Sequence, residues 1–283
     1  MVKIKKQMPV LLPVHAASYN TGMRRCAFFQ NLSNALYVNF LNRANFGSMN
    51  IVITGASRGI GFAIAEKFAE AGPQNSLFLS SQNESRIRAA AEVLTERFPP
   101  NRIEWIAADL SEGKGVQKLK TWLQGKKVVA DVLVNNAGYF IPGSIHNEEN
   151  GTLEKMLNVN LLSAYNLTRA LLPGMMERKS GHIFNMCSIA SFAAYKNGGS
   201  YSISKFALLG FGKNLRQEMM PYHIKVTNIL PGAVYTDSWA ESGMLAERLM
   251  EAKDVASLVF AAAQLSPRAC PEEIIIRPIL GDL

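Results

Sequence analysis

The chain has 283 residues, of which 48% are hydrophobic and 18% are charged, so it is long and apolar enough to bury a sizeable core. It contains no run of about 18 apolar residues, which excludes an ordinary transmembrane helix. Its three cysteines lie far apart, so they form neither a disulfide framework nor the spacing of a metal site. We therefore expect a cytoplasmic protein without a metal and without a membrane partner.

The formal net charge of +8 arises mostly in residues 1–48, a leader that contains six basic residues and no acidic one. The rest of the chain carries 24 basic and 22 acidic side chains, so it is nearly neutral. A basic face for nucleic acid is therefore not expected.

Several interpretations of the leader remain open. The alternatives are a translated stretch upstream of a natural start at Met49, an organellar transit peptide, a secretory signal, and a mobile tail or oligomer contact. We expect the leader to be disordered and dispensable for folding and catalysis, because its periodicity is not sustained. A competing expectation is a short amphipathic helix that packs on the rest of the chain. It rests on five apolar residues at near-helical spacing: Phe28, Phe29, Leu32, Leu36 and Phe40.

A short β-branched run at residues 50–54 predicts the first strand. Gly55, Gly59 and Gly61 follow it, before a helical pattern that continues to Ala71. Such a turn makes an anion site, because glycines allow backbone amides to approach a pyrophosphate and the helix dipole favours its charge. A plain glycine turn is the alternative, since glycine motifs alone are weak signals.

The rest of the sequence alternates between strand-like and helix-like runs. The predicted strands are 50–54, 77–81, 103–107, 129–134, 182–186, 225–230 and 273–277. Besides the helix that ends at Ala71, the predicted helices are 86–98, 115–123, 153–172, 201–219 and 252–265. This alternation predicts an α/β fold, a single Rossmann-type doubly wound parallel sheet of about seven strands with helices on both faces. Residues 49–283 form one domain in this prediction, with the cofactor and substrate sites inside it.

Further polar features follow strands or open a helix. Asp109 follows the third strand, and residues 135–138, Asn-Asn-Ala-Gly, follow the fourth. Ser188 follows the fifth strand, while Tyr201 and Lys205 open a helix four residues apart. In this order, the features resemble the short-chain dehydrogenase/reductase family.

The resemblance covers essentially all of residues 49–283 and none of the leader. It implies that the catalytic residues are Asn160, Ser188, Tyr201 and Lys205. Together with the cofactor argument below, it implies that the cofactor contacts Gly55, Ser57, Arg58, Gly59, Ile60, Gly61, Ser81, Gln82, Asp109, Asn136, Ala137, Gly138, Tyr201, Lys205, Pro231, Gly232 and Thr236. Asp109 would bind the adenine amino group, and residues 231–236 would lie beside the nicotinamide carboxamide.

The chemistry of these side chains suits hydride transfer to a carbonyl. A ketone that receives hydride becomes an alkoxide and needs a proton, and Tyr201 is the expected donor. A free phenol has a pKa of about 10, and the Lys205 ammonium with the positive nicotinamide is expected to lower it. Ser188 would orient the carbonyl and stabilise developing charge. In the family this asparagine holds a water molecule that links the lysine to solvent, and the resemblance implies the same role for Asn160.

The cofactor is predicted to be NADP(H) rather than NAD. NAD binders place an acidic residue about 20 residues past the glycine loop, where it holds the ribose hydroxyls. Here that position falls within residues 80–83, which are Ser, Ser, Gln and Asn. A 2′-phosphate would meet no carboxylate there, and Arg58 offers a cation. Gln82 departs from the many NADP-using relatives that have arginine.

The segment after Gly232 closes the substrate pocket in the family. Here Trp239, Met244 and Leu245 are candidates for an apolar lid, and an opposite wall is expected from two aromatic side chains, Phe140 and Tyr195. Ordinary core packing explains these residues equally well.

The substrate itself stays open. Residues 231–236 and 272–278 resemble bacterial sepiapterin-reductase-type members, whereas the catalytic set suits 3-oxoacyl-(acyl-carrier-protein) reductases equally well. We expect an enzyme acting on a small carbonyl or alcohol. A non-catalytic NADP-sensing regulator on the same fold is the alternative, although such proteins typically lose the tyrosine or lysine.

Two further expectations concern packing. Cys187, next to Ser188, and the scattered histidines are expected to be structural or surface residues rather than reactive groups. The helices at 153–172 and 201–219 are apolar on more than one face, which predicts a homodimer or homotetramer.

Overall fold

The computed structural model describes residues 48–72, 74–236 and 245–282. The chain divides into two units, Met1–Gly47 and Ser48–Leu283, and all the described residues belong to the second. The expectations for the leader, and those for Trp239 and Met244 as lid residues, lie outside the described residues.

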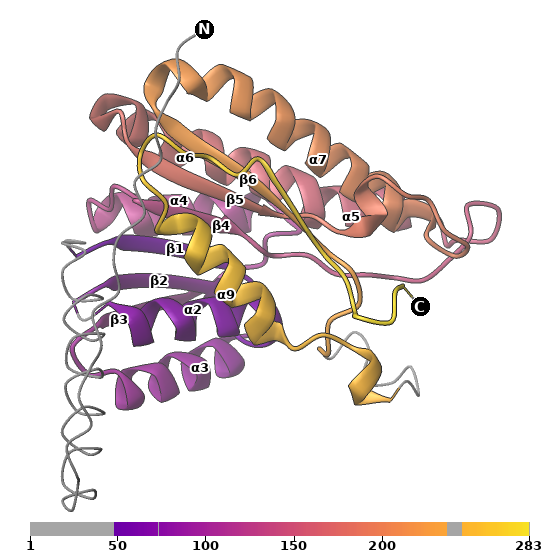
Figure 1. Ribbon diagram of the computed structural model, residues 1–283, viewed down its shortest axis with the longest axis horizontal. Helices are drawn as coiled ribbons and strands as arrows, with labels where there is room; N and C mark the ends of the chain where they lie inside the picture. Colours follow the sequence, from indigo (N-terminus) through magenta and orange to yellow (C-terminus); the bar gives the residue numbers. More distant parts are fainter. Residues whose placement is uncertain (1–47, 73, 237–244, 283) are drawn as a thin grey trace, which may run out of the picture. The chain divides into compact units, whose positions relative to one another are not determined.

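Seven parallel strands form one sheet in the order β3-β2-β1-β4-β5-β6-β7 (Figure 1). They are β1 (Asn50–Thr54), β2 (Ser76–Ser81), β3 (Arg102–Ala107), β4 (Val132–Asn135), β5 (Gly181–Met186), β6 (Ile224–Pro231) and β7 (Glu273–Ile276). The strand order reverses between β1 and β4. Connections after these two strands leave the sheet in opposite directions, which opens a crevice at their carboxyl ends.

Helices cover both faces of the sheet, and the alternation of side chains along β1 shows how. Ile51 and Ile53 enter the core under α2 (Gly59–Ala71), α3 (Glu84–Arg97) and α9 (Ala252–Ala263). Val52 enters the core on the other face. That face is covered by α4 (Gly113–Gly125), α6 (Ser163–Arg178) and α7 (Gly199–Met219). The predicted fold class is confirmed.

The helix predicted at 153–172 has a different form in the structure. It consists of α5 (Thr152–Leu157), one π-helical turn η1 (Asn158–Leu162) and α6, which passes through Pro173 and ends at Arg178. The expected end before Pro173 is therefore wrong. Proline removes one backbone donor there, and α6 continues because Leu171 and Met175 are buried against the sheet on either side of it.

His182 is a buried, neutral part of β5 and is 3% exposed. The Thr227 hydroxyl donates to the Pro271 carbonyl, so the His182 ring must donate from Nε2 to Thr227 over 2.7 Å. Burial, with a smaller contribution from the positive charge of Lys225, lowers the pKa of His182 to about 2. The ring is therefore uncharged whenever the protein is folded at ordinary pH.

This burial predicts a loss of stability in mild acid. In the unfolded chain His182 takes up a proton below its ordinary pKa of about 6.5, whereas in the folded chain it does not, so stability falls as pH falls. At pH 5 the loss from this residue is about 2 kcal/mol relative to high pH. His182→Gln keeps an N–H donor for Thr227 and does not titrate. Urea unfolding at pH 7 and at pH 5 gives the free energy of unfolding at each pH. The fall in this free energy from pH 7 to pH 5 should be about 2 kcal/mol smaller in the variant than in the parent, and an equal fall would contradict the assignment.

Candidate active site

A cavity of about 960 Å³ opens at the carboxyl ends of the central strands. Most of the residues predicted from the sequence line it: Gly55, Ser57, Arg58, Gly59, Ile60, Ser81, Gln82, Asp109, Asn136, Ala137, Gly138, Ser188, Tyr201, Lys205, Pro231, Gly232 and Thr236. Gly61 and Asn160 are not among the lining residues, but each contacts residues that are. Gly61 packs against Gly55, and Asn160 accepts a hydrogen bond from the Tyr139 amide. The fold thus gathers predicted residues that are up to 181 positions apart in the chain, from Gly55 to Thr236.

The glycine loop between β1 and α2 has the backbone that the motif requires. Gly55 and Gly59 have φ values of +64° and +57°, a region that side-chain-bearing residues rarely adopt. A Cβ on Gly61 would lie 2.4 Å from the Gly55 carbonyl oxygen, so only glycine lets α2 pack this closely on the loop. The first turn of α2 contains no acidic residue and faces the cavity. This cradle suits a pyrophosphate, which backbone amides and the helix dipole would hold.

Asn136 holds the glycine loop in place. Its side-chain amide donates to the carbonyls of Thr54 and Gly55, at 3.0 and 3.1 Å. The Thr54 hydroxyl in return accepts from the backbone amides of Asn136 and Ala137. The Thr54 hydroxyl also donates to the Val134 carbonyl, so side chains connect the end of β1 and the end of β4 by five hydrogen bonds at the switch point.

The end of the cavity at β2 and β3 contains the residues assigned to the adenosine. The Ser57 and Ser81 hydroxyls lie 2.9 Å apart, and Gln82 donates to an Asp109 carboxylate oxygen over 2.7 Å. Burial acts to raise the pKa of Asp109, but hydrogen bonds from Ser111 and Gln82 outweigh it and lower the pKa. Asp109 is thus held as a carboxylate that can accept hydrogen bonds.

Ser188, Tyr201 and Lys205 meet at the other end of the cavity, where β5 ends and α7 begins. The Ser188 side chain lies close enough to the Tyr201 hydroxyl to act on its pKa. Lys205 is 5% exposed, and its Nζ donates to the Met186 carbonyl over 2.7 Å and lies 5.7 Å from the centre of the Tyr201 ring. Two hydroxyl groups and a buried amine therefore line the same cavity as the glycine loop.

Lys205 by itself does not lower the pKa of the phenol, and the contribution expected from the nicotinamide stays a prediction. Burial raises the pKa of Tyr201 to about 12, and the nearby Ser188 side chain acts in the opposite direction without outweighing it. Burial also lowers the pKa of Lys205 to about 8. The lysine does not offset the burial of the phenol, because its ammonium donates to the Met186 carbonyl rather than to the phenol oxygen.

Asn160 lies in the π-helical turn and binds protein groups on both sides. Its Oδ1 accepts from the Tyr139 amide at 3.0 Å, and its Nδ2 donates to the Tyr139 carbonyl and to the Ser204 hydroxyl. The side chain thus fixes the segment after β4 against the helix that carries Tyr201. The water that the resemblance gives to Asn160 stays a prediction.

Of the aromatic wall and apolar lid expected around a substrate, the structure has the wall at the Tyr201 end of the cavity, here called the substrate end. Phe140 packs edge-on against Tyr201 with ring centres 4.9 Å apart, and Tyr195, 47% exposed, lines the same cavity. Leu245 is 70% exposed and does not line the cavity. Asp282 also lines the cavity, and it was not predicted because no sequence motif marks it.

Cys187 is 2% exposed, and burial raises the pKa of its thiol to about 12. The thiol is therefore a protonated packing group and not a nucleophile.

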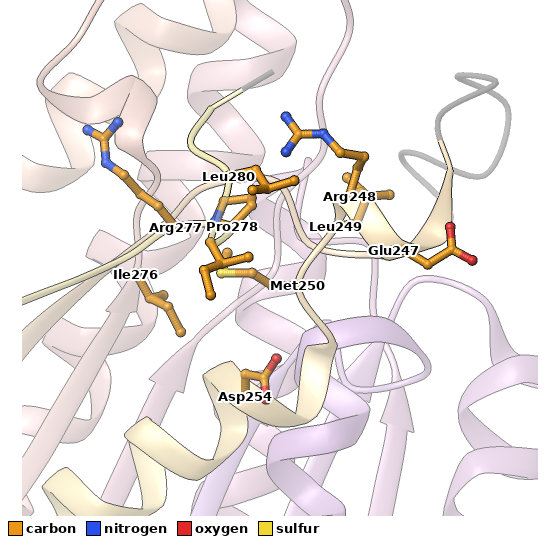
Figure 2. Close-up of a pocket in the computed structure, with 10 residues that line it drawn as sticks. Glu247, Arg248, Leu249, Met250, Asp254, Ile276, Arg277, Pro278 and Leu280 are labelled. Atoms are coloured by element: carbon orange, nitrogen blue, oxygen red, sulfur yellow. The ribbon is translucent and has the colours of Figure 1, made fainter.

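A second, smaller cavity of about 290 Å³ lies between residues 247–250 and the chain after β7, around Pro278 and Leu280 (Figure 2). It contains none of the residues predicted for catalysis.

Comparison with known proteins agrees with this geometry. The family model described as short chain dehydrogenase matches residues 49–244. The chain belongs to the short-chain dehydrogenase family. It is 33% identical over 239 residues to a sepiapterin reductase from Chlorobaculum tepidum, an alignment that covers 82% of this chain and 97% of that protein.

Solved structures of the family are also similar. An alcohol dehydrogenase from the archaeon Thermococcus sibiricus, complexed with 5-hydroxy-NADP, is 25% identical with a TM-score of 0.76, covering 82% of this chain and 97% of its own. An L-sorbose reductase from Gluconobacter frateurii, complexed with NADPH and L-sorbose, is 27% identical with a TM-score of 0.74. The match covers 82% of this chain and 96% of the reductase chain. The sequence-based family resemblance is therefore confirmed.

Proposed function

We propose that this short-chain dehydrogenase is an NADP(H)-dependent oxidoreductase that interconverts a small carbonyl compound and its alcohol. The observation that carries the proposal is that Ser188, Tyr201 and Lys205 line the same cavity as the glycine loop. A regulator that only senses cofactor would have no need of this set. The solved relatives in complex with NADPH or an NADP derivative, and the sepiapterin reductase, support the cofactor and the substrate class.

In this proposal each residue has a defined task. The glycine loop would hold NADPH, which would supply the hydride for the carbonyl carbon. Ser188 donates a hydrogen bond to the carbonyl oxygen and orients it. Tyr201, whose pKa of about 12 keeps it protonated at neutral pH, gives its proton to that oxygen as the alcohol forms. Lys205 supplies a buried positive charge near the tyrosinate that is left.

The test is a panel of carbonyl compounds with NADPH and with NADH, in which the absorbance of the reduced cofactor reports turnover. The panel contains sepiapterin, a 3-oxoacyl thioester, a keto sugar and simple aromatic ketones. NADPH oxidation that depends on one of these classes supports the proposal and names the substrate class. Tight NADPH binding without turnover of any class would favour the non-catalytic regulator.

NADPH preference is expected to be at least about tenfold in kcat/KM, a difference of about 1.4 kcal/mol. The end of β2 carries Ser81 and Gln82 rather than an acid, so a 2′-phosphate meets hydroxyl and amide donors. Ser81→Asp should move the preference toward NADH by repelling that phosphate, whereas the uncharged Ser81→Asn should not. Equal kcat/KM for the two cofactors in the parent protein would refute the preference.

A homo-oligomer is also expected, since apolar side chains on two long helices are exposed. Tyr165 and Leu162 are 40% and 43% exposed near the start of α6, and Ile203 and Phe206 are 41% and 45% exposed on α7. A face of this kind is typical of an interface between subunits. Light scattering at micromolar concentration should give the mass of a dimer or tetramer, and a monomeric mass would contradict the prediction.

In the part of the chain that is described, no helix combines the length and apolar character needed to cross a membrane. The cytoplasmic location inferred from the cysteines stays a prediction.

A further inference from the structure

A carboxylate from a distant loop binds the first turn of the helix that carries Tyr201. Glu148 accepts a hydrogen bond from the Ser200 backbone amide at 2.8 Å through Oε1, and its Oε2 accepts from the Ser200 hydroxyl. These two residues are 52 positions apart, and Ser200 directly precedes Tyr201. Glu148 is not among the residues that line the 960 Å³ cavity, so it does not contact a substrate there.

The start of α7 needs this acceptor. The first amides of a helix have no partner within the helix, and the N-cap residue here is Gly198, which has no side chain to accept from them. The Glu148 carboxylate replaces the missing cap, and its charge is favourable at the positive end of the helix dipole. Helix α7 has 21 residues, so that dipole is fully developed.

Two glycines make room for the carboxylate. A Cβ on Gly199 would lie 2.0 Å from Glu148 Oε1, and a Cβ on Gly143 would lie 2.7 Å from Glu148 Cγ. Gly199 also has a φ of +20°, at the edge of the region that favours glycine. The close approach of the carboxylate therefore depends on glycine in both segments.

The loop that carries Glu148 is joined to the segment before α7. The Gly143 amide donates to the Asn197 carbonyl at 3.2 Å, and the Ser144 hydroxyl donates to the Asn197 side chain at 2.8 Å. The Glu148 amide donates to the Ser144 carbonyl at 3.0 Å. The segment after Phe140 and the segment after Tyr195, two walls of the substrate end, are thus held together with the first turn of α7.

We propose that Glu148 is a positioning residue for Tyr201. It holds the first turn of α7 so that the phenol hydroxyl stays at the Ser188 hydroxyl and at the carbonyl that receives hydride. The inference rests on the proposed function, in which Tyr201 is the proton donor. Because rates depend steeply on the alignment of reacting groups, a small shift of this turn lowers kcat without changing how the cofactor binds at the other end of the cavity.

The test compares Glu148→Leu, which has no acceptor, with Glu148→Gln, which keeps an amide oxygen for the Ser200 N–H. Glu149→Leu, at the exposed neighbouring position, is the matched control. Glu148→Leu is expected to lower kcat by about 10- to 100-fold and to leave the Kd for NADPH within about twofold. Glu148→Gln should keep kcat within about threefold of the parent, and the control should match the parent.

Hydrogen exchange provides a second measurement that needs no substrate. In Glu148→Leu the amides at the start of α7 should exchange faster, while the rest of α7 keeps its protection. Uniformly faster exchange, equal kcat losses for Leu and Gln, or an unchanged kcat in Glu148→Leu would each overturn the positioning role. If the parent turns over no carbonyl compound, the proposed function fails while hydrogen exchange still decides the contact. If Tyr201→Phe is inactive and Glu148→Leu is not, only the positioning role fails.

Discussion

Tyr201→Phe is expected to lower kcat by about 10³-fold, the size typical of losing a positioned general acid. The phenol hydroxyl is the proposed proton donor, and the phenylalanine ring fills the same space beside Phe140, whose ring centre lies 4.9 Å away. NADPH binding should persist, because the glycine loop and the residues near Asp109 do not depend on the hydroxyl. Cofactor titration and steady-state rates on the purified variant measure both quantities.

Tyr222→Phe is a matched control, since Tyr222 is partly buried against the core on the far side of the sheet from α9 and does not line the cavity. It should keep the parent kcat. A Tyr201→Phe variant with near-normal turnover would remove Tyr201 from the mechanism. A variant that no longer binds NADPH would show that the hydroxyl serves cofactor binding rather than proton transfer.

Gly61→Ala is expected to weaken both the fold and cofactor binding. The added Cβ would lie 2.4 Å from the Gly55 carbonyl oxygen and 2.5 Å from the Asn136 side-chain nitrogen, so the glycine loop or α2 must move. Overpacking of this kind costs about 1–3 kcal/mol of unfolding free energy, or several degrees in Tm. We expect the Kd for NADPH to rise about tenfold or more, because the displaced loop contains the amides that would hold the pyrophosphate.

Gly113→Ala at the start of α4 is the matched control, because a Cβ there meets nothing within 4 Å. It should leave Kd unchanged and stability equal or slightly higher, since alanine reduces the freedom of the unfolded chain. Thermal melting and NADPH titration of the two variants decide the comparison. A Gly61→Ala protein that binds NADPH like the parent would show that the contact between α2 and the loop does not shape the cradle.

The fold and most of the candidate site were predictable because their signals are local in sequence. The alternation of apolar strands and amphipathic helices determines a parallel sheet with helices on both faces, and the end of each parallel strand falls on one edge of that sheet. Gly55, Asp109, Ser188 and Tyr201 each follow a strand or open a helix, so the topology alone brings them to that edge. No knowledge of side-chain contacts was needed for this step.

Other features depend on contacts between segments that are far apart in the chain, and only the tertiary structure decided them. Periodicity does not show that α6 passes through Pro173, because neighbouring buried side chains outweigh the local preference of proline. The pKa of Tyr201 rises to about 12 because of burial, and burial is not encoded in a four-residue spacing. The contact between Glu148 and Ser200 has no motif, since it depends on how a loop meets the first turn of a helix 52 positions away. The sequence by itself determined which residues reach the carboxyl edge of the sheet. Packing determined their charge and alignment, because desolvation and hydrogen bonding act over ångströms in space rather than over positions in the chain.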